Sequence, residues 1–357
     1  MAQRTLYTTL YVFDGDCYMN DNRHLQSAKN AKDDEFYTTY ETIESELQHY
    51  TRHFRNKTVL CNCDDPLESN FCRFFLRNFN LLKLKRLICT SYAYSKISTE
   101  QNDICQANGN GTVLDINRRQ IGMGQLTEAG VRWFLRENNI VKPLKGDGDF
   151  RSNECIAYLD VADIIVTNPP FSLFKELVFL LYKKKKKYLL IGNQNALTYK
   201  EIFPLLQRNQ AWTGYRFGDM KFRVPQSSLP RKTRYWVDNT GQKWRSLGNA
   251  MWLTNLDNSK RHTWLQLTRE YDPRFYPKYD NYDAIHVSKV IDIPNNYFGV
   301  MGVPITIVDK LNPEQFEIIG EANHGSDNEF DLFKPTINGK EVFKRILIRH
   351  KRNIANV

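Results

Sequence analysis

The sequence predicts an α/β protein with a doubly wound, mostly parallel sheet. The main observation is a short, continuous apolar run from Ile164 to Thr167, in which most residues are β-branched. Such runs are typical of central parallel strands buried on both faces. The run stops abruptly in a polar residue, two prolines and an aromatic, Asn168 to Phe171. Because ligands bind at the carboxyl ends of strands in open α/β sheets, we expect the functional site there.

The segments before this run predict alternating helices and strands. Apolar residues at spacings of three and four predict a helix, and they are Ile43, Leu47, Tyr50 and Phe54. Thr58 to Cys61 predicts the first strand, and Asp65 and Pro66 predict the cap and first position of the next helix. Arg86 to Thr90 predicts a second strand, whereas the segment 96–124, with its glycines and asparagines, suggests a surface excursion.

The segments after the run complete the predicted sheet. A helix follows Phe171 and ends in the five-lysine run Lys183–Lys187, directly before the strand Tyr188 to Gly192. We therefore expect these lysines at the amino edge of the sheet, as a solvated helix end that complements the helix dipole. Phe217 to Val224 and Ala250 to Leu256 predict an antiparallel terminal strand pair.

Composition narrows the class of protein. The chain has 357 residues, 41% of them hydrophobic, enough for a real core in one large domain or two. No apolar run approaches a membrane span, and residues 1–13 lack the features of a signal peptide, so we expect a cytoplasmic protein without a membrane partner. The net charge of +10 suits a polyanionic partner.

The seven cysteines all lie in the first half of the chain, and none forms a Cys-x-x-Cys pair. This pattern favours reduced, buried thiols. Cys61 and Cys63 are one residue apart, but two further ligands at zinc spacing are missing. We therefore expect no metal.

The residues Asn168, Pro169, Pro170 and Phe171 suit methylation of a planar amino group. The lone pair of such a nitrogen is delocalised, which makes it a poor nucleophile. The Asn168 side-chain oxygen and the Pro169 carbonyl could each accept a hydrogen bond from the NH₂ and aim its lone pair at a methyl donor. The prolines would hold the backbone rigidly, and Phe171 would offer a stacking platform for a flipped-out base. The alternative is a plain strand-to-turn junction.

A basic, Pro-rich insertion, 225–248, lies between the two terminal strands. From Tyr215 to Arg261 there are ten Lys or Arg and three Asp or Glu, a net charge of 10 − 3 = +7. Basic residues interleaved with aromatics suit contacts with nucleic-acid phosphates and bases. The alternative is a basic surface loop. The candidate DNA-binding residues are Arg231, Lys232, Arg234, Lys243 and Arg245.

Four longer segments resemble the EcoRI-type adenine-specific DNA methyltransferases, as does the Asn168–Phe171 motif. They are Asp34–Thr38, Cys61–Pro66, Gly146–Ser152 and Tyr276–Ile285. The likeness runs from about Lys32 to about Arg349. It implies a Rossmann-like methyltransferase fold that uses S-adenosylmethionine. The chain departs from most such enzymes in two places, because the loop after the first strand has no glycine and no acidic residue follows the second strand.

The resemblance also implies the cofactor-binding residues. One segment would lie against the methionine part of the cofactor, a second would form the loop after the first strand, and Asp149 would accept from the adenine amine while Phe150 packs near its ring. The residues are Phe36, Tyr37, Thr38, Asn62, Cys63, Asp64, Asp65, Asp149 and Phe150.

The expected function is methylation of the exocyclic amine of a flipped-out adenine in double-stranded DNA, as the modification half of a restriction-modification system. We expect a catalytic domain at 32–256, an N-terminal extension of unknown role at 1–31, and a C-terminal region at 257–357 for target recognition and packing. By resemblance the enzyme acts as a monomer. The alternatives are an RNA or protein-glutamine methyltransferase of the same fold, or a catalytically inactive DNA-binding relative.

Overall fold

The computed structural model describes residues 37–93, 109–122, 124–137, 140–226, 228–230, 232–322 and 334–351. Two predicted site residues, Phe36 and Arg231, and the predicted extension 1–31 lie outside these residues. The described residues belong to one compact unit, 34–357.

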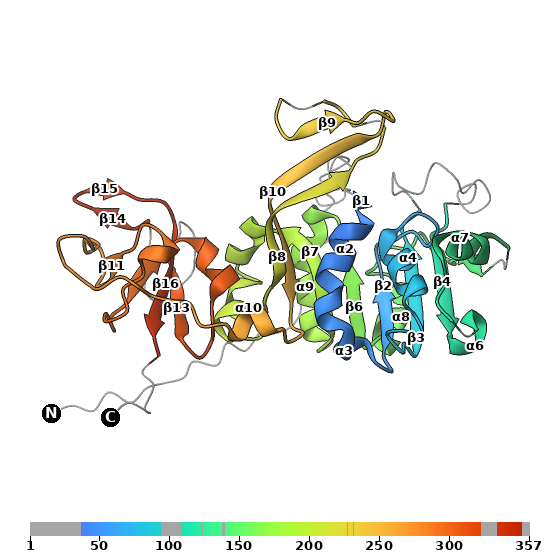
Figure 1. Ribbon diagram of the computed structural model, residues 1–357, viewed down its shortest axis with the longest axis horizontal. Helices are drawn as coiled ribbons and strands as arrows, with labels where there is room; N and C mark the ends of the chain where they lie inside the picture. Colours follow the sequence, from blue (N-terminus) through green and yellow to red (C-terminus); the bar gives the residue numbers. More distant parts are fainter. Residues whose placement is uncertain are drawn as a thin grey trace. The chain divides into compact units, whose positions relative to one another are not determined.

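Ten strands form one mixed sheet in the order β1-β8-β10-β7-β6-β2-β3-β4-β5, with β9 paired to β10 (Figure 1). The strands are β1 (Tyr37–Thr38), β2 (Thr58–Cys61), β3 (Arg86–Ser91), β4 (Thr112–Asn117), β5 (Val141–Pro143), β6 (Ile164–Thr167), β7 (Lys187–Asn193), β8 (Trp212–Arg223), β9 (Tyr235–Val237) and β10 (Lys243–Thr254). The four central strands β7, β6, β2 and β3 are parallel. The described strands outside this centre pair antiparallel. The prediction of a mostly parallel sheet was therefore too strong, but the predicted terminal antiparallel pair is present as β8 and β10.

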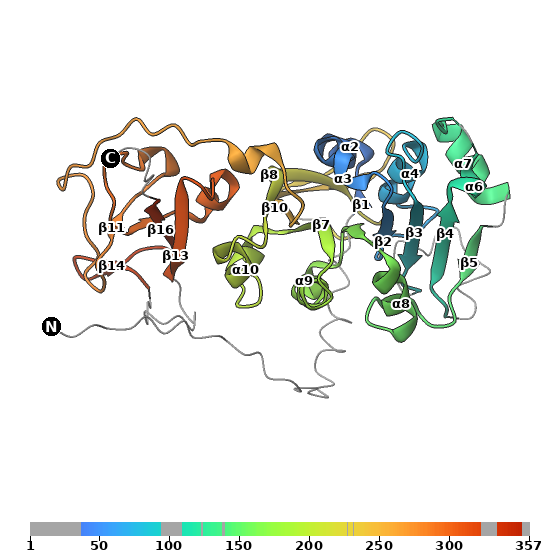
Figure 2. The same cartoon turned by 90° about the horizontal axis from the view of Figure 1, so that it is seen from below.

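Helices cover both faces of the sheet (Figure 2). One face carries α2 (Tyr40–Leu47), α3 (Thr51–Phe54), α4 (Asn70–Arg77), α6 (Arg118–Ile121) and α7 (Glu128–Glu137), and the other carries α8 (Asn153–Val161), α9 (Phe174–Lys183) and α10 (Phe203–Gln207). Short 3₁₀ turns are η1 (Gln48–Tyr50), η3 (Phe171–Leu173) and η4 (Gln194–Thr198). Successive side chains of a strand point to opposite faces. Val59 and Cys61 accordingly enter one core and Leu60 the other.

Most predicted elements before the site are present, with two corrections. The four apolar residues that predicted a helix lie in α2, η1 and α3 with no exposed surface. The helix expected directly after Asp65 begins only at Asn70, because Asp65 first caps a turn and Ser69 then caps α4. The segment 96–124, expected as a surface excursion, contributes β4, whose Val113, Leu114 and Ile116 are buried. The neighbouring glycines and asparagines hid this strand.

The terminal strands β8 and β10 extend beyond the sheet as an arm. Ala250 pairs with Asn193 at the carboxyl end of β7, so residues 243–249 continue past that end of the parallel strands. They pair there with β8 and with β9 (Figure 1). The predicted insertion 225–248 is therefore partly regular, and Lys243 and Arg245 lie in β10, not in a loop.

The C-terminal region adds a smaller sheet in the order β11-β12-β16-β13 and a separate hairpin, β14-β15. Its elements are η5 (Ser259–His262), β11 (Ile285–His286), η6 (Val290–Asp292), β12 (Met301–Val303), η7 (Ile305–Lys310), β13 (Phe316–Ala322), β14 (Thr336–Ile337), β15 (Lys340–Glu341) and β16 (Arg345–His350). Val308, Phe316 and Ile346 belong to the same buried cluster as Leu205 of α10 and Leu253 of β10. This region therefore shares a core with one face of the large sheet.

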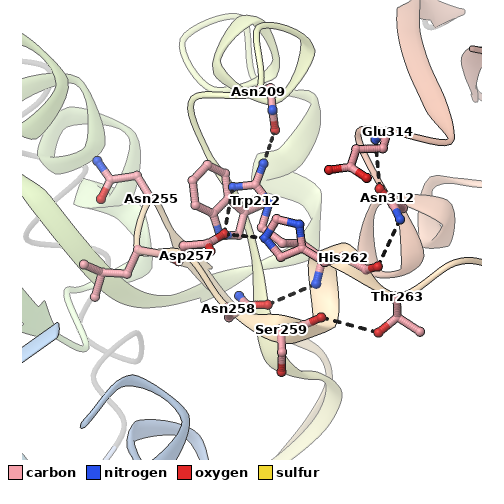
Figure 3. Close-up of polar contacts among 12 residues, drawn as sticks. Asn209, Trp212, Asn255, Asp257, Asn258, Ser259, His262, Thr263, Asn312 and Glu314 are labelled. Atoms are coloured by element: carbon pink, nitrogen blue, oxygen red, sulfur yellow. Dashed lines mark hydrogen bonds and ion pairs between the residues drawn. The ribbon is translucent and has the colours of Figure 1, made fainter. Parts of the chain in front are cut away.

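A polar junction joins β10 to the C-terminal region at the amino-terminal edge of the parallel strands (Figure 3). The Asn258 side chain accepts from the Arg261 backbone N–H at 3.2 Å and caps η5. The Arg261 guanidinium lies 3.5 Å from the Trp212 ring centroid, and His262 Nε2 lies 2.8 Å from an Asp257 carboxylate oxygen. These polar groups hold one another in place.

Candidate active site

The parallel strands bring the predicted site segments to one edge of the sheet. Asn62 to Asp65 follow β2, Asn168 follows β6, and both strands run in the same direction. The Gly146–Phe150 loop reaches this edge too, because β5 ends there. The loop packs so closely on β3 that a Cβ atom at Gly148, where φ is +83°, would lie 2.0 Å from the Ser91 carbonyl oxygen. Only glycine fits this backbone position.

Asn168 is half-buried and fixed by hydrogen bonding. Its Nδ2 donates to Thr38 Oγ1 at 3.2 Å, and the Thr38 carbonyl accepts from Asn70 Nδ2 at 2.8 Å. Thr38, predicted to bind cofactor, thus touches the proposed catalytic amide; its contact with a cofactor stays a prediction. The neighbouring Tyr37 stacks on Arg223, with the guanidinium carbon 4.2 Å from the ring centroid.

The two prolines and Phe171 form a tight exit from β6. Pro169 is buried and Pro170 half-buried. The Pro170 carbonyl accepts from the Leu173 N–H at 2.9 Å within η3. Since that carbonyl is used inside the turn, the Pro169 carbonyl is the one suited to a second acceptor role. Phe171 is half-buried and packs against the core on the α2 and α4 side.

Asp64 joins the loop after β2 to β6. Its carboxyl accepts from Thr167 Oγ1 at 2.6 Å and from Ser69 Oγ at 2.7 Å, and its backbone N–H donates to the Thr90 carbonyl at 3.0 Å. Burial raises the pKa of Asp64 to about 7, against the two hydroxyl donors, which lower it. Thr167 and Ser69 were not among the predicted site residues. The sequence feature that could have revealed Thr167 is a hydroxyl at the end of an otherwise apolar strand, directly before Asn168.

Asp65 is also buried, but one of its oxygens has a different environment. Oδ1 accepts from the Leu67 N–H at 2.8 Å. Oδ2 is buried and has no hydrogen-bond partner among the described residues. Burial raises the pKa of Asp65 to about 6. Buried acceptors in native proteins nearly always have partners, so this oxygen suits a donor from a bound molecule.

Asp149 is tied to its own loop and to the helix that follows Asn168. Both of its carboxylate oxygens accept from the Arg151 guanidinium, with the shortest contact at 2.6 Å, and Arg151 also donates to Glu176 of α9 at 3.0 Å. Burial raises the pKa of Asp149, but the hydrogen bonds from Arg151 outweigh it, and the net pKa is lowered. Phe150 is buried in the core beside this group. The loop is thereby fixed at the edge that carries Asn168.

The arm collects three of the predicted DNA-binding residues around one pocket, which is lined by Lys232, Thr233, Arg234 and Arg245 to Asn249. Arg234 donates to Asp219 at 3.0 Å, and its guanidinium lies so close over Gly248 that a Cβ there would meet it at 2.2 Å. Lys243 instead donates to the main-chain carbonyls of Gln226 and Ser228, the latter at 3.0 Å. Its ammonium therefore shapes the arm, unlike Lys232, which is exposed.

The remaining features of the described residues concern disulfides, metal-binding groups and membrane-spanning helices. Of the cysteines there, Cys61, Cys72, Cys89 and Cys155 are free and buried, and Cys63 is free and half-buried. The described residues contain no group of three or more His, Cys, Asp or Glu side chains arranged to hold a metal ion. Within the same ranges, no helix has the length and apolarity needed to cross a membrane.

The sheet and the Asn168–Phe171 motif are consistent with a methyltransferase fold. A family model described as adenine-specific methyltransferase EcoRI matches residues 24–351, and the chain belongs to this family. It is similar to the type II methyltransferase M.EcoRI of Escherichia coli, with 46% identity over 93% of this chain and 97% of the relative.

Two mycoplasma proteins are also similar. The type II methyltransferase M.MpnI of Mycoplasma pneumoniae is 33% identical over 93% of this chain and 99% of its own length. M.MgeORF184P of Mycoplasma genitalium, another type II methyltransferase, is 36% identical over 83% of this chain and 85% of its own length. No solved structure matches the chain significantly. The protein is therefore a DNA methyltransferase of the type II, restriction-modification kind.

Proposed function

We propose that this enzyme transfers a methyl group from S-adenosylmethionine to the exocyclic amine of an adenine flipped out of duplex DNA. The observation that carries the proposal is the Asn168 amide, held by Thr38 at the carboxyl end of β6 and followed by two prolines. In a restriction-modification system such an enzyme is the modification half. It would act as a monomer and, since its substrate is the chromosome, in the cytoplasm.

The chemistry of the target amine explains the motif. Two acceptors, the Asn168 side-chain oxygen and the Pro169 carbonyl, bind the NH₂ group and draw the nitrogen towards tetrahedral geometry. This frees its lone pair for direct attack, and a proton leaves the nitrogen as the new N–C bond forms. The fixed φ of both prolines keeps the backbone acceptor in place. Phe171 stacks on the flipped base. S-adenosylmethionine would supply an electrophilic methyl group, whose bond to the sulfonium sulfur would break as the N–C bond forms, with S-adenosylhomocysteine as the leaving group.

The residues at the strand ends fit that cofactor. The buried Asp65 Oδ2 offers an acceptor that suits an ammonium or a ribose hydroxyl. The loop after β2 carries this oxygen, and the Asp149 loop, which follows β5, packs on the end of β3, the strand next to β2. This arrangement is expected for a Rossmann-like methyltransferase. The residues that would hold the cofactor are Tyr37, Asn62, Cys63, Asp65, Asp149 and Phe150, with Phe36 proposed from the sequence alone.

The arm and the C-terminal region would bind the DNA. The arm continues past the sheet edge that carries Asn168, and its pocket presents Lys232, Arg234 and Arg245. Cations in this position neutralise backbone phosphates and hold the duplex over the site. Arg231 would add to them, and residues 257–357 would help to recognise the target sequence.

The test is incubation with labelled cofactor and a library of DNA duplexes, next to single-stranded DNA, RNA and protein. We expect label in duplexes that share one short sequence. Label in RNA or on protein glutamine would replace the proposed substrate, and no label in any substrate, with cofactor binding intact, would indicate a catalytically inactive relative.

A further inference from the structure

Asn168 is held at two points by a closed ring of contacts. Asp64 accepts from Thr167, the residue directly before Asn168, and Asn168 donates to Thr38. The ring then returns through Asn70 and Ser69, because Thr38 accepts from Asn70 and Ser69 donates back to Asp64. The backbone before Asn168 and its amide nitrogen are thus both tied to the start of α4.

We propose that Asp64 is a positioning residue for methyl transfer, which acts by holding Thr167 and thereby fixes Asn168 relative to the cofactor loop. The inference rests on the proposed function of Asn168. It goes beyond the prediction that Asp64 belongs to the cofactor-binding loop, because it assigns the carboxyl a role towards Thr167.

The surroundings of Asp64 argue for a specific role. The residue is 7% exposed, Thr167 is 0% exposed, and the described partners of the carboxyl are two hydroxyls and no cation. Burying a carboxyl without a cation is costly in an apolar environment. A neutral or apolar residue would serve a purely structural purpose at lower cost. A carboxyl, however, accepts two short hydrogen bonds from two different segments at once.

Thr167 directly precedes Asn168, so the hydrogen bond between Thr167 and Asp64 should affect the methyl-transfer rate. An acceptor that must meet the target amine tolerates little displacement, and an error of about 1 Å can cost roughly 100-fold. Removing the Thr167 hydroxyl loosens one of the two points that fix Asn168. The Thr167 hydroxyl itself donates to Asp64 within the protein. The expected loss therefore appears in kcat and not in cofactor affinity.

The chain offers a matched control at the opposite edge. Thr254 is the last residue of β10 as Thr167 is of β6, both have 0% exposure, and Thr254 Oγ1 also donates at 2.6 Å, to the Tyr188 carbonyl. Thr167→Val and Thr254→Val thus remove the same group with the same burial. Thr254 Oγ1 also accepts from the Leu256 N–H at 3.0 Å, so its loss should disturb the local structure at least as much. Both substitutions should lower the melting temperature, Thr254→Val by at least as much as Thr167→Val.

The experiment measures kcat, cofactor Kd and melting temperature for the full chain with a duplex that the wild type methylates. We expect Thr167→Val to lower kcat by roughly 10- to 100-fold with cofactor Kd within about threefold, and Thr254→Val to keep kcat. Thr167→Ser should restore most of kcat. Asp64→Asn, which can still accept from Thr167 and donate to Ser69, should be far milder than Asp64→Ala.

Equal kcat in the two valine variants would overturn the proposal, and so would a loss confined to cofactor binding. Failure of the proposed function is seen separately, because the wild type would then not methylate any duplex.

Discussion

The two edges of the central sheet are both rich in polar residues, yet they differ in how those residues are satisfied. At the amino edge Thr254 donates to a main-chain carbonyl. Asn258 caps η5 there, and Asp257 contacts His262 (Figure 3). At the carboxyl edge Asp64 accepts only side-chain hydroxyls, and Asp65 Oδ2 has no described partner. A polar cluster alone is therefore no sign of a site. The buried Asp65 Oδ2, an acceptor without a described partner, is what distinguishes the carboxyl edge.

The largest difference between the edges should appear when each loses one polar side chain. Asn168→Ala should raise the activation free energy of methyl transfer by roughly 3 kcal/mol or more, because one of two aligned acceptors is lost. This corresponds to a rate lower by a factor of about 100 or more. His262→Ala at the other edge breaks an exposed contact worth less than about 1 kcal/mol and should leave the rate unchanged. Single-turnover kinetics measures both. Near-normal transfer by Asn168→Ala would remove this residue from the mechanism.

Glu46, which contacts the middle of β8, should instead control stability against pH. Glu46 of α2 accepts from the Tyr215 and Arg216 N–H groups and from Tyr50, and burial raises its pKa from 4.5 to about 7. A raised pKa means that the folded state resists ionisation. Its contribution is full below about pH 4.5 and declines by up to about 3 kcal/mol as pH rises through 7.

Glu46→Gln should flatten that decline, measured as the difference in urea midpoint between pH 5 and pH 8. The same pH dependence in variant and wild type would show that Glu46 ionises normally. Methyl transfer at pH 6 should be little affected, since Glu46 lies away from the carboxyl edge.

Within the carboxyl edge, substitutions in the cofactor site and in the site of the target base should have different effects on cofactor binding. Asp149→Ala should weaken S-adenosylmethionine binding by about 1.5–3 kcal/mol, the usual contribution of a hydrogen bond to a charged group, whereas Phe171→Ala should not. Calorimetry without DNA measures this directly. The reverse pattern would mean that the loops at the strand ends were assigned to the wrong ligands.

The smallest expected effect compares lysines at the two edges. Lys232→Ala in the arm should flatten the slope of log affinity against log salt by about 0.9, as for one lost phosphate contact. Lys184→Ala removes a cation that pairs with Asp160 at 2.9 Å beside the amino edge, and it should leave the slope unchanged. Equal slopes for both variants would place the DNA somewhere other than on the arm.

The sequence predicted the central features of the fold because these depend on local pattern. Thr58–Cys61 and Ile164–Thr167 occupy β2 and β6 as expected. Of the five lysines, four precede β7 at the amino edge and Lys187 is its first residue. By contrast β4 was missed, because its neighbours favour turns and its burial comes from pairing with β3, which is distant in sequence. The length of β10 was underestimated for a similar reason, since basic residues in the arm pair with β8 instead of forming a loop.

The site could be predicted only as far as residue types at strand ends reveal it. Asn168 to Phe171 were predicted in this way, whereas Asp64 and Asp65 were predicted from the resemblance to the EcoRI-type family. The roles of Thr38, Thr167 and Ser69 depend on contacts across 130, 103 and 5 residues of chain, which only the fold brings together. The sequence also did not reveal that Lys232 is exposed while Lys243 donates to two main-chain carbonyls, because both are cations in one basic insertion.

The most direct test of the central claim is the identity of the methylated atom. A duplex methylated by the wild-type enzyme is digested to nucleosides, which are separated by chromatography and identified by mass spectrometry. The proposal that Asn168 and Pro169 activate an exocyclic amine predicts N6-methyladenine, and no such product from Asn168→Ala under the same conditions. A methyl group on a cytosine ring carbon, or N6-methyladenine formed at the wild-type rate by Asn168→Ala, would contradict it.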